Sequence, residues 1–221
     1  MLNSSICVYG LYLGDRSQYI CGIGHKPLQD LVGGELSAVF EPEFELEKLQ
    51  NADSETALKL ALAYSEIQIQ IFAEVRSMLP WSLRSAFFPT LELFQTFLSQ
   101  QHTNFSQRLS QLQNCAEISL TGKFSAPHPP TQLEGRAYFL AKKQAFAQQQ
   151  QRHQQAQAIV ELMQPQQVIW QAPRPPEQFR VTLLVNLSEL QTRQAQIQQW
   201  QIDHPGWELD LSAPLPPYSF I

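Results

Sequence analysis

The sequence predicts an α+β fold in two domains. In the first half, short β-type segments give way to two long segments with helical spacing of apolar residues. The second half has the element order β-α-β-β-α-β, typical of the ferredoxin-like, split-βαβ arrangement. The length, 221 residues, allows two domains of about 100–120 residues, each with its own core. We therefore expect a modified ferredoxin-like N-terminal domain over 1–113. A ferredoxin-like C-terminal domain should cover 114–221, with an extended Pro-rich tail at 213–221.

Three short strands are expected in the first domain. Residues 6–13 are rich in β-branched and aromatic side chains, and a turn at 14–17 leads back into a second such segment, 19–23. This pattern predicts a hairpin. A third strand, 36–40, should end before Pro42, because proline lacks the amide that a strand ladder needs.

Two long helices should follow the strands. Residues 54–78 place apolar side chains at helical spacing, and Asp53 or Ser54 can cap the amino end. Because two apolar stripes run along this helix, we expect it to be buried on two sides. The next helix begins at Pro89 and has one apolar stripe, which predicts a surface helix. The first helix's stripes are Leu60, Tyr64, Ile67, Ile71, Val75 and Met78, and Leu58, Leu62, Ile69, Phe72 and Leu79; the second helix's stripe is Leu91, Phe94, Leu98, Phe105, Leu109 and Leu112.

The second domain should contain four strands and two helices. Ser188 and Gln191 form a capping box that marks the start of its last helix. Its long helix carries a glutamine-rich run, 148–155, with no apolar stripe, so this stretch cannot face a core. A solvated overhang or a helix break is the plainer interpretation, and a polar surface for a partner is the alternative. The expected elements are strand 117–121, helix 134–163, strands 167–171 and 179–187, helix 188–202 and strand 207–211.

Composition disfavours several classes of function. The net charge of −5 and the pI near 5.5 argue against a nucleic-acid partner, which needs a strong positive field. Ferredoxin-like folds include RNA-recognition modules, but the candidate strand 179–185 lacks their Arg/Lys-Gly-Phe-like motif. Three widely spaced cysteines, Cys7, Cys21 and Cys115, are typical of a reducing compartment. Since no signal core and no apolar run of about 20 residues is present, we expect a cytoplasmic protein with no membrane partner.

No group of residues predicts catalysis or a cofactor. Cys21 and His25 lie close in sequence, but a functional site would need Asp30 or Glu35 to fold back onto them, and we interpret the pair as a strand cysteine and a turn histidine. Gly22 and Gly24 lack the context of a phosphate loop and therefore predict turns. A run of carboxylates could perform acid–base chemistry in a cleft, but a solvated acidic edge is the commoner outcome. These carboxylates are Glu41, Glu43, Glu45 and Glu47. We expect no catalytic residue, no cofactor and no metal site.

Two aromatic segments are the remaining candidates for function. Trp81, Phe87 and Phe88 lie between the two helices of the first domain, in a segment bounded by prolines. They form either a buried inter-domain core or an exposed patch for an apolar partner. The tail, 214–221, cannot be helix or central strand because of its three prolines. We expect an extended strap in which Tyr218 and Phe220 dock across the two domains.

The tail and the opening strand together resemble a known family. The chain has Val8-Tyr9-Gly10-Leu11-Tyr12 near its start and ends on Pro214-Leu215-Pro216-Pro217-Tyr218-Ser219-Phe220-Ile221. These motifs are similar to the Tyr-Val-Tyr-Gly-Ile-like strand and the Gly-Pro-Trp-Pro-Pro-Tyr-Ser-Phe ending of the gas vesicle protein F/L family (GvpF/GvpL). Tyr64 with Glu66, and Leu79-Pro80, resemble further family positions. The chain departs from the family at Ala213 and Leu215, where Gly and Trp are usual, and at 81–85, where an Arg-Phe-Gly-Thr-like run is usual.

The resemblance implies a two-domain protein with a ferredoxin-like element, no catalysis, and a role in forming gas vesicles, which are protein-walled, gas-filled compartments. Their shell subunit exposes an apolar surface and would aggregate before assembly. The implied partners are this shell protein and other gas vesicle accessory proteins, and the implied location is the gas vesicle. Because no group of residues predicts catalysis, our own hypothesis is that a sheet edge or the aromatic segment 81–88 contacts the shell subunits. The alternative function is that of a small-molecule-binding or regulatory ferredoxin-like protein, which a deep apolar pocket would favour.

Overall fold

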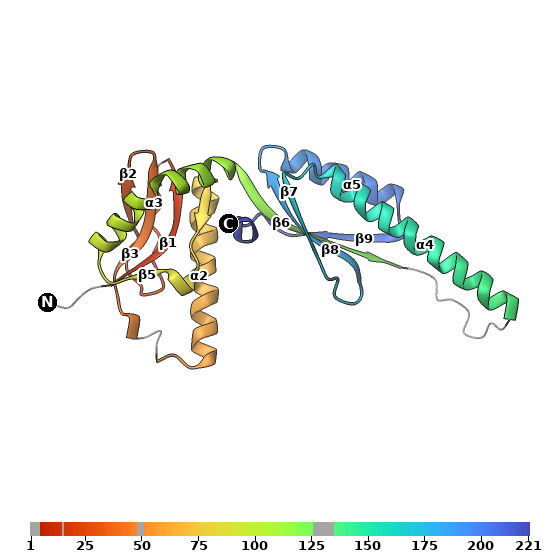
Figure 1. The fold of residues 1–221 in the computed structure, drawn as a ribbon, viewed down its shortest axis with the longest axis horizontal. Coiled ribbons are helices and arrows are strands. Elements are labelled where there is room, and N and C mark those ends of the chain that lie inside the picture. The colour runs from red at the N-terminus through yellow and green to blue at the C-terminus, as the bar shows by residue number, and fades with distance from the viewer. Residues whose placement is uncertain (1–4, 15, 48–50, 126–134) are drawn as a thin grey trace. The chain divides into compact units, whose positions relative to one another are not determined.

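The computed structural model describes residues 5–14, 16–47, 51–125 and 135–221 (Figure 1). Its internal contacts divide the chain into two compact units. Unit 1 comprises Met1–Ala116 together with Leu215–Ile221, and unit 2 comprises Glu117–Pro214. The sequence placed the boundary after residue 113 and grouped the tail with the second domain, whereas the contacts group most of the tail with unit 1.

The sheet of unit 1 is built around its first strand. Strand β1 pairs antiparallel with β3 on one side and with β4 and β5 on the other, and β2 extends the sheet beyond β3. Seven of the nine residues of β1 are buried, as the centre of a sheet requires. The strands are β1 (Ser5–Leu13), β2 (Gln29–Gly33), β3 (Leu36–Phe44), β4 (Met78–Pro80) and β5 (Phe87–Phe88).

Two sequence expectations for this sheet are wrong. Residues 19–23 do not form a strand of a hairpin; Cys21 makes a single bridge with Pro27, and β2 takes the place at the sheet edge. Strand β3 also continues through Pro42 instead of ending before it. The pairing register of β1 and β3 shifts between Ser5 and Cys7, and such an irregularity accommodates a residue without an amide hydrogen.

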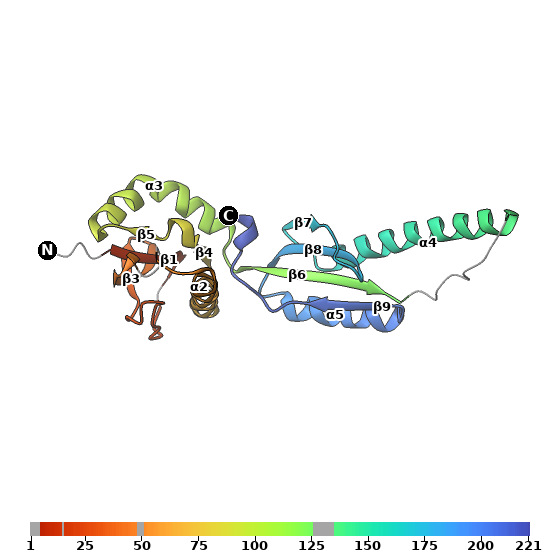
Figure 2. The same ribbon diagram turned by 90° about the horizontal axis from the view of Figure 1, so that it is seen from below.

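The two long helices of unit 1 both contact β1 (Figure 2). Helix α2 (Ser54–Val75) begins as expected at Asp53, whose side chain accepts a hydrogen bond of 2.8 Å from the Thr56 amide. It is not buried on two sides, because Leu58 and Leu62 are 60% and 56% exposed. Helix α3 (Leu91–Gln111) has the expected single buried stripe. That stripe is Phe94, Leu98, Phe105 and Leu109.

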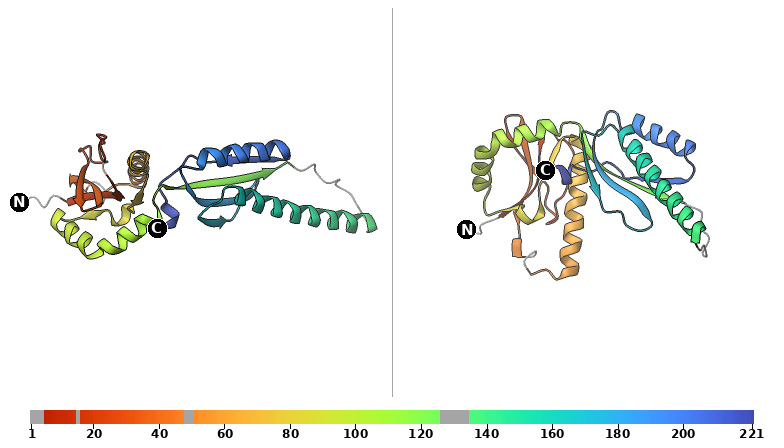
Figure 3. Two further views of the ribbon diagram at one scale, coloured as in Figure 1. Left: turned by 90° about the horizontal axis from the view of Figure 1, so that it is seen from above. Right: turned by 45° about the vertical axis from the view of Figure 1, so that its right-hand side comes forward.

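Unit 2 has a four-stranded sheet in the order β7-β8-β6-β9. Helices α4 and α5 lie side by side and share one hydrophobic core with the sheet (Figure 3). The core joins Ile159 and Met163 near the end of α4, Ile197 of α5, and Val181 and Leu183 of β8. The elements are β6 (Cys115–Phe124), α4 (Gly135–Leu162), β7 (Gln167–Gln171), β8 (Glu177–Asn186), α5 (Leu190–Asp203) and β9 (Trp207–Leu211).

The predicted α+β class is confirmed, with two antiparallel sheets and the helices α2–α5 among the described residues. The observed order β-α-β-β-α-β from β6 to β9 agrees with the sequence pattern, while the ferredoxin-like description of each unit stays a prediction. The expected capping box is wrong. No side chain caps α5, and the Ser188 amide and hydroxyl instead both donate to Asn186 Oδ1, at 2.9 and 2.7 Å.

Candidate functional site

A buried carboxylate organises the loop that precedes β2. Glu41 lies on β3 with no exposed surface. Its Oε2 accepts hydrogen bonds from the Tyr9 hydroxyl and the Gly24 amide, both at 3.0 Å, and its Oε1 accepts one from the Lys26 amide at 2.9 Å. A buried carboxylate is tolerated when donors surround it in this way. Glu41 therefore fixes the loop of residues 22–26 against the sheet.

The expected solvated acidic edge is wrong for Glu41. Glu43 and Glu45 are exposed, and Glu43 pairs with Lys26 on the surface. Strand β3 continues past residue 40, and side chains on both of its faces are buried as far as Glu41. Glu41 is therefore carried into the core. The sequence signal that could have found it is the pair Gly22 and Gly24: a Cβ at either position would lie 2.1 or 2.8 Å from a Glu41 carboxylate oxygen.

Helix α2 extends this polar network. The Tyr64 ring stacks on the Tyr9 ring with centroids 4.8 Å apart, and the Tyr64 hydroxyl donates to the Val8 carbonyl at 2.6 Å. The Gln68 amide nitrogen donates to the carbonyls of Tyr9 at 2.6 Å and Trp81 at 2.9 Å. These bonds satisfy backbone groups of β1 and of the segment after β4. The network therefore holds helix, sheet and loop together.

Two phenols of this network and a thiol beside it have raised pKa values. Burial raises the pKa of Tyr9 and of Tyr64 well above the usual range for a phenol. Burial likewise raises the pKa of the neighbouring Cys7 thiol, so this thiol stays protonated, and the thiolate is the reactive form. The arrangement positions backbone and presents no titrating group to solvent.

Cys21 and His25, the other residues considered for chemistry in the sequence, are exposed and outside the buried hydrogen-bond network. Cys21 is exposed, and His25 sits in an exposed turn with φ of 66°. Within the described ranges, no group of three His, Cys, Asp or Glu residues could hold a metal ion.

The structure separates the three aromatic residues proposed as a partner contact. The Trp81 and Phe88 rings lie 6.3 Å apart, and both pack on Phe94, with centroid distances of 6.2 and 4.8 Å. Phe87, on the other side of β5, packs instead on Phe44 at 5.1 Å. All three are half-buried, so part of each ring faces solvent. Trp81 and Phe88 thus belong to an aromatic cluster within unit 1 that also contains Phe94, Phe97 and Phe105.

The tail is extended as far as Pro217 and then turns. Leu215 makes a bridge, Pro216 and Pro217 are buried, and residues Tyr218–Phe220 form a single turn of 3-10 helix. The Tyr218 side chain lies close enough to Tyr64 to contribute to the raised pKa of that residue. Tyr218 and Phe220 are half-buried, and their docking across two domains stays a prediction.

Two depressions are open to solvent. One, of about 360 Å³, lies between the β2–β3 hairpin and α3, where Leu31, Leu36 and Leu98 line it. The other, of about 490 Å³, follows one flank of α4.

Among the described helices, none combines the length and the apolar character needed to cross a membrane.

A family model described as gas vesicle synthesis protein GvpL/GvpF matches residues 5–221. The chain belongs to the GvpL/GvpF family. The match includes the opening strand, both units and the tail, so the resemblance stated from the sequence is confirmed. Membership of the GvpL/GvpF family supports a role related to gas vesicles.

Solved GvpF structures share the fold of this GvpL/GvpF chain. The chain is similar to GvpF from Anabaena sp. PCC7120, with a TM-score of 0.71 and 12% identity over 98% of this chain and 95% of that chain. It is also similar to GvpF from Microcystis aeruginosa, with a TM-score of 0.69 and 12% identity over 98% of both chains. A search of curated proteins finds no match.

Proposed function

We propose that this GvpL/GvpF protein is a non-enzymatic accessory or minor structural protein that binds shell subunits during gas vesicle assembly, in the cytoplasm and at the vesicle. The family match over residues 5–221 carries the proposal. A shell that encloses gas needs an apolar inner surface, and subunits with such a surface associate indiscriminately before assembly unless a partner covers it. The buried, protonated phenols and thiol of unit 1 also suit a structural role better than a catalytic one.

The proposed contact uses the half-buried rings of Trp81, Phe87 and Phe88. Aromatic side chains supply much of the energy of protein interfaces, and those that are already held by neighbours lose little conformational entropy on binding. Trp81 is held in this way, because its ring nitrogen donates to the Ser85 carbonyl at 3.0 Å and its ring contacts Phe97 and Phe105 at 6.0 and 5.7 Å. The outer parts of these rings are the proposed binding surface.

Co-purification with the gas vesicle shell protein tests this function. The wild-type chain should retain the co-expressed shell protein on an affinity column, and the double variant Phe87→Ser/Phe88→Ser should lose it. Because both rings also pack inside unit 1, the control is Leu109→Ser, which weakens the core of unit 1 at a buried position of α3 outside the aromatic cluster. This control variant should have a lower melting temperature, but at temperatures where it is folded it should still bind the shell protein. Retention by the double variant, or equal loss in both, would contradict the proposed contact, and failure of the wild-type chain would contradict shell binding itself.

A further inference from the structure

No described residue of unit 2 packs on the amino-terminal half of α4. From Gly135 to Gln151 every residue is exposed except Ala141, which is half-buried. Contacts with the rest of unit 2 begin at Arg152, whose guanidinium carbon lies 4.3 Å from the centre of the Phe124 ring, and at Gln155, which accepts a 3.0 Å hydrogen bond from Trp207. Figures 1 and 2 show this half of α4 running past the end of the sheet. The solvated overhang expected for the glutamine run thus also includes the residues before it.

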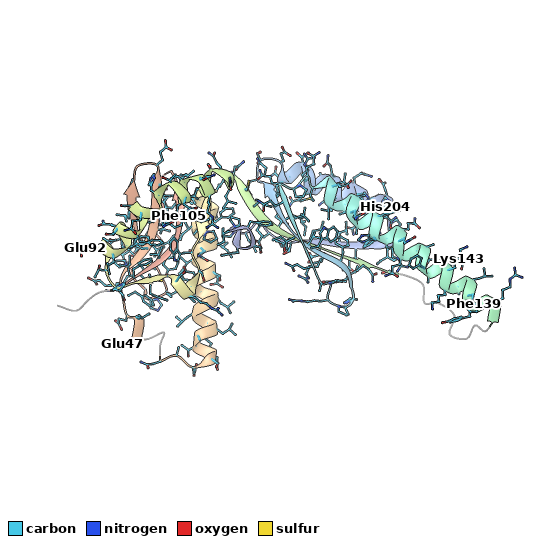
Figure 4. All side chains as sticks on the ribbon, viewed as in Figure 1. Glu47, Glu92, Phe105, Phe139, Lys143 and His204 are labelled. Carbon is cyan, nitrogen blue, oxygen red and sulfur yellow. The ribbon has the colours of Figure 1, made fainter. Side chains whose placement is uncertain are left out.

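A seam of side chains spaced seven residues apart, two of them aromatic, runs along this overhang and into the turn that follows it. Phe139, Phe146 and His153 follow one another every seven residues, and the next position in the series, Val160, is buried in the core. Phe139 is 70% and Phe146 62% exposed (Phe139 is labelled in Figure 4). A seven-residue repeat is the spacing that lets one helix pack along another. The helix face that packs inside unit 2 therefore continues outward as a seam that none of the described residues covers.

A depression follows the same seam. It has a volume of about 490 Å³, and Phe146 and His153 are among the residues that line it. The other lining residues are glutamines of α4: Gln149, Gln150, Gln154 and Gln157. At one end of the depression, the His153 ring lies 6.4 Å from the ring of Trp170. Trp170 belongs to the edge strand β7, and its side chain is 46% exposed. Polar side chains therefore border the seam on one flank of α4.

The charge of the overhang identifies the kind of partner. Between Gly135 and Val160 the chain has four basic residues and no acidic one, although its net charge is −5. Arg136 and Lys143 flank the seam, and Lys142 lies three residues after Phe139 within it. In paired helices, the charges beside the seam select the partner. A partner with acidic flanks fits this surface.

Two other occupants fit less well. A second copy of α4 would place Lys142 against its own equivalent if parallel, and Arg136 against Lys143 if antiparallel. A membrane surface requires the apolar side chains to gather on one face. Here the exposed Tyr138, Phe139 and Leu140 are consecutive, so successive side chains point about 100° apart around the helix.

We propose that the amino-terminal half of α4, along the seam of Phe139, Phe146 and His153, is a docking site for an amphipathic helix with acidic flanks from another polypeptide. The site lies in unit 2 and does not depend on Trp81, Phe87 or Phe88. Because the seam contains a histidine, a lysine and glutamines, the contact should be weak and reversible.

Two fluorescent three-heptad peptides test the proposal on the full chain. Both carry leucine at the seam positions, and their flanks carry glutamate in one and lysine in the other. Fluorescence anisotropy should show the glutamate peptide binding at least about ten-fold more tightly than the lysine peptide, with the preference reduced at high salt. The variant Phe139→Ser/Phe146→Ser should weaken this binding at least about ten-fold, and Lys142→Glu/Lys143→Glu should reverse the preference.

The matched control is Leu58→Ser/Leu62→Ser, which removes an equally exposed apolar pair from α2 in unit 1 and should leave binding unchanged. All variants change exposed side chains, so unchanged circular dichroism and melting temperature are expected. Equal binding of the two peptides, or equal loss in the control, would overturn the proposal. So would seam-dependent binding to phosphatidylserine vesicles without peptide discrimination, or seam-dependent self-association of the chain.

Discussion

At the scale of single residues, Glu41 shows how one buried acidic side chain can order a loop. The carboxylate accepts three hydrogen bonds, two of them from backbone amides of the loop and one from Tyr9. No regular secondary structure satisfies those amides, so the loop depends on the side chain. Gly22 and Gly24 let the loop approach the carboxylate closely.

We expect Glu41→Gln to destabilise unit 1 by about 1–3 kcal/mol. Both oxygens of Glu41 accept hydrogen bonds, but a glutamine has only one acceptor oxygen. Its amide NH2 group would point its hydrogens at another donor, and that donor would lose its hydrogen bond. Urea unfolding followed by fluorescence measures the change. The control is the neighbouring Glu43→Gln, which removes only an exposed ion pair with Lys26 and should leave the midpoint where it is. Equal effects of the two substitutions would show that the buried bonds of Glu41 are not important.

At the scale of elements, α2 joins the parts of unit 1 through side chains that bond to backbone. Tyr64 and Gln68 lie one turn apart and both donate to the carbonyl of Trp81, each at 2.9 Å. Gln68 also donates to the Tyr9 carbonyl of β1, and the single hydroxyl hydrogen of Tyr64 is shared between the carbonyls of Trp81 and Val8. The helix therefore fixes the segment after β4 relative to the sheet, and with it the position of the Trp81 ring.

Removing the hydroxyl of Tyr64 tests this connection. Tyr64→Phe should lower the free energy of unfolding by about 1–2 kcal/mol, because the Val8 carbonyl loses a buried donor while the ring can still stack on Tyr9. Thermal unfolding measures the loss. Tyr19→Phe is the control, since that ring is 78% exposed. A wild-type midpoint for Tyr64→Phe would rule out a structural contribution from the hydroxyl.

Elements with strong local patterns were predictable from the sequence. The bounds of β7 and β9 agree with the predicted strands 167–171 and 207–211, and Asp53 caps α2 as expected. Residues 19–23 were predicted as a strand because their composition favours one, but long-range bonds from Glu41 and Tyr9 hold the adjoining backbone, 23–26, in a loop. The second apolar stripe of α2 led to the wrong prediction that the helix is buried on two sides. The spacing of apolar residues shows which side chains share a helix face, but it does not show whether another element packs on that face.

The candidate surfaces were only partly predictable. The sequence identified Trp81, Phe87 and Phe88 as a segment, but not that Phe87 points away from the other two, because this depends on the pairing of β5 with β1. For α4, the glutamine run indicated an overhang, while the aromatic seam before it was masked by the apolar residues around it. A seam becomes visible only when the exposure of each side chain is known.

At the scale of the whole molecule, the grouping of the tail matters most. Leu215–Ile221 belong to unit 1, although unit 2 separates them from it in the sequence. Pro216 and Pro217 are buried, and proline adds stability because it restricts the unfolded chain. Unit 1 is therefore incomplete without residues from the far end of the chain.

Deletion of Pro214–Ile221 should lower the melting temperature of unit 1. Each kcal/mol lost lowers the midpoint by roughly 4–8 °C in a domain of 60–100 residues and by roughly 2–4 °C in one of 150–250, and unit 1 lies between these sizes, so a shift of several degrees is expected. Differential scanning calorimetry should show this shift with the transition of unit 2 unchanged. Removal of Ile221 alone is the control, because that side chain is 43% exposed. An unshifted midpoint after the larger deletion would mean that the tail adds nothing to unit 1.

The grouping of the tail also sets an order of events on the ribosome. Proteins made from amino to carboxyl end usually fold their first domain first. Here Leu215–Ile221 leave the ribosome only after all of unit 2 has been translated. Unit 2 can therefore complete its folding before unit 1 does. Nascent chains would pass through a stage in which the Tyr64 side of unit 1 lacks its cover, and a chaperone that binds such intermediates would meet this protein at that stage.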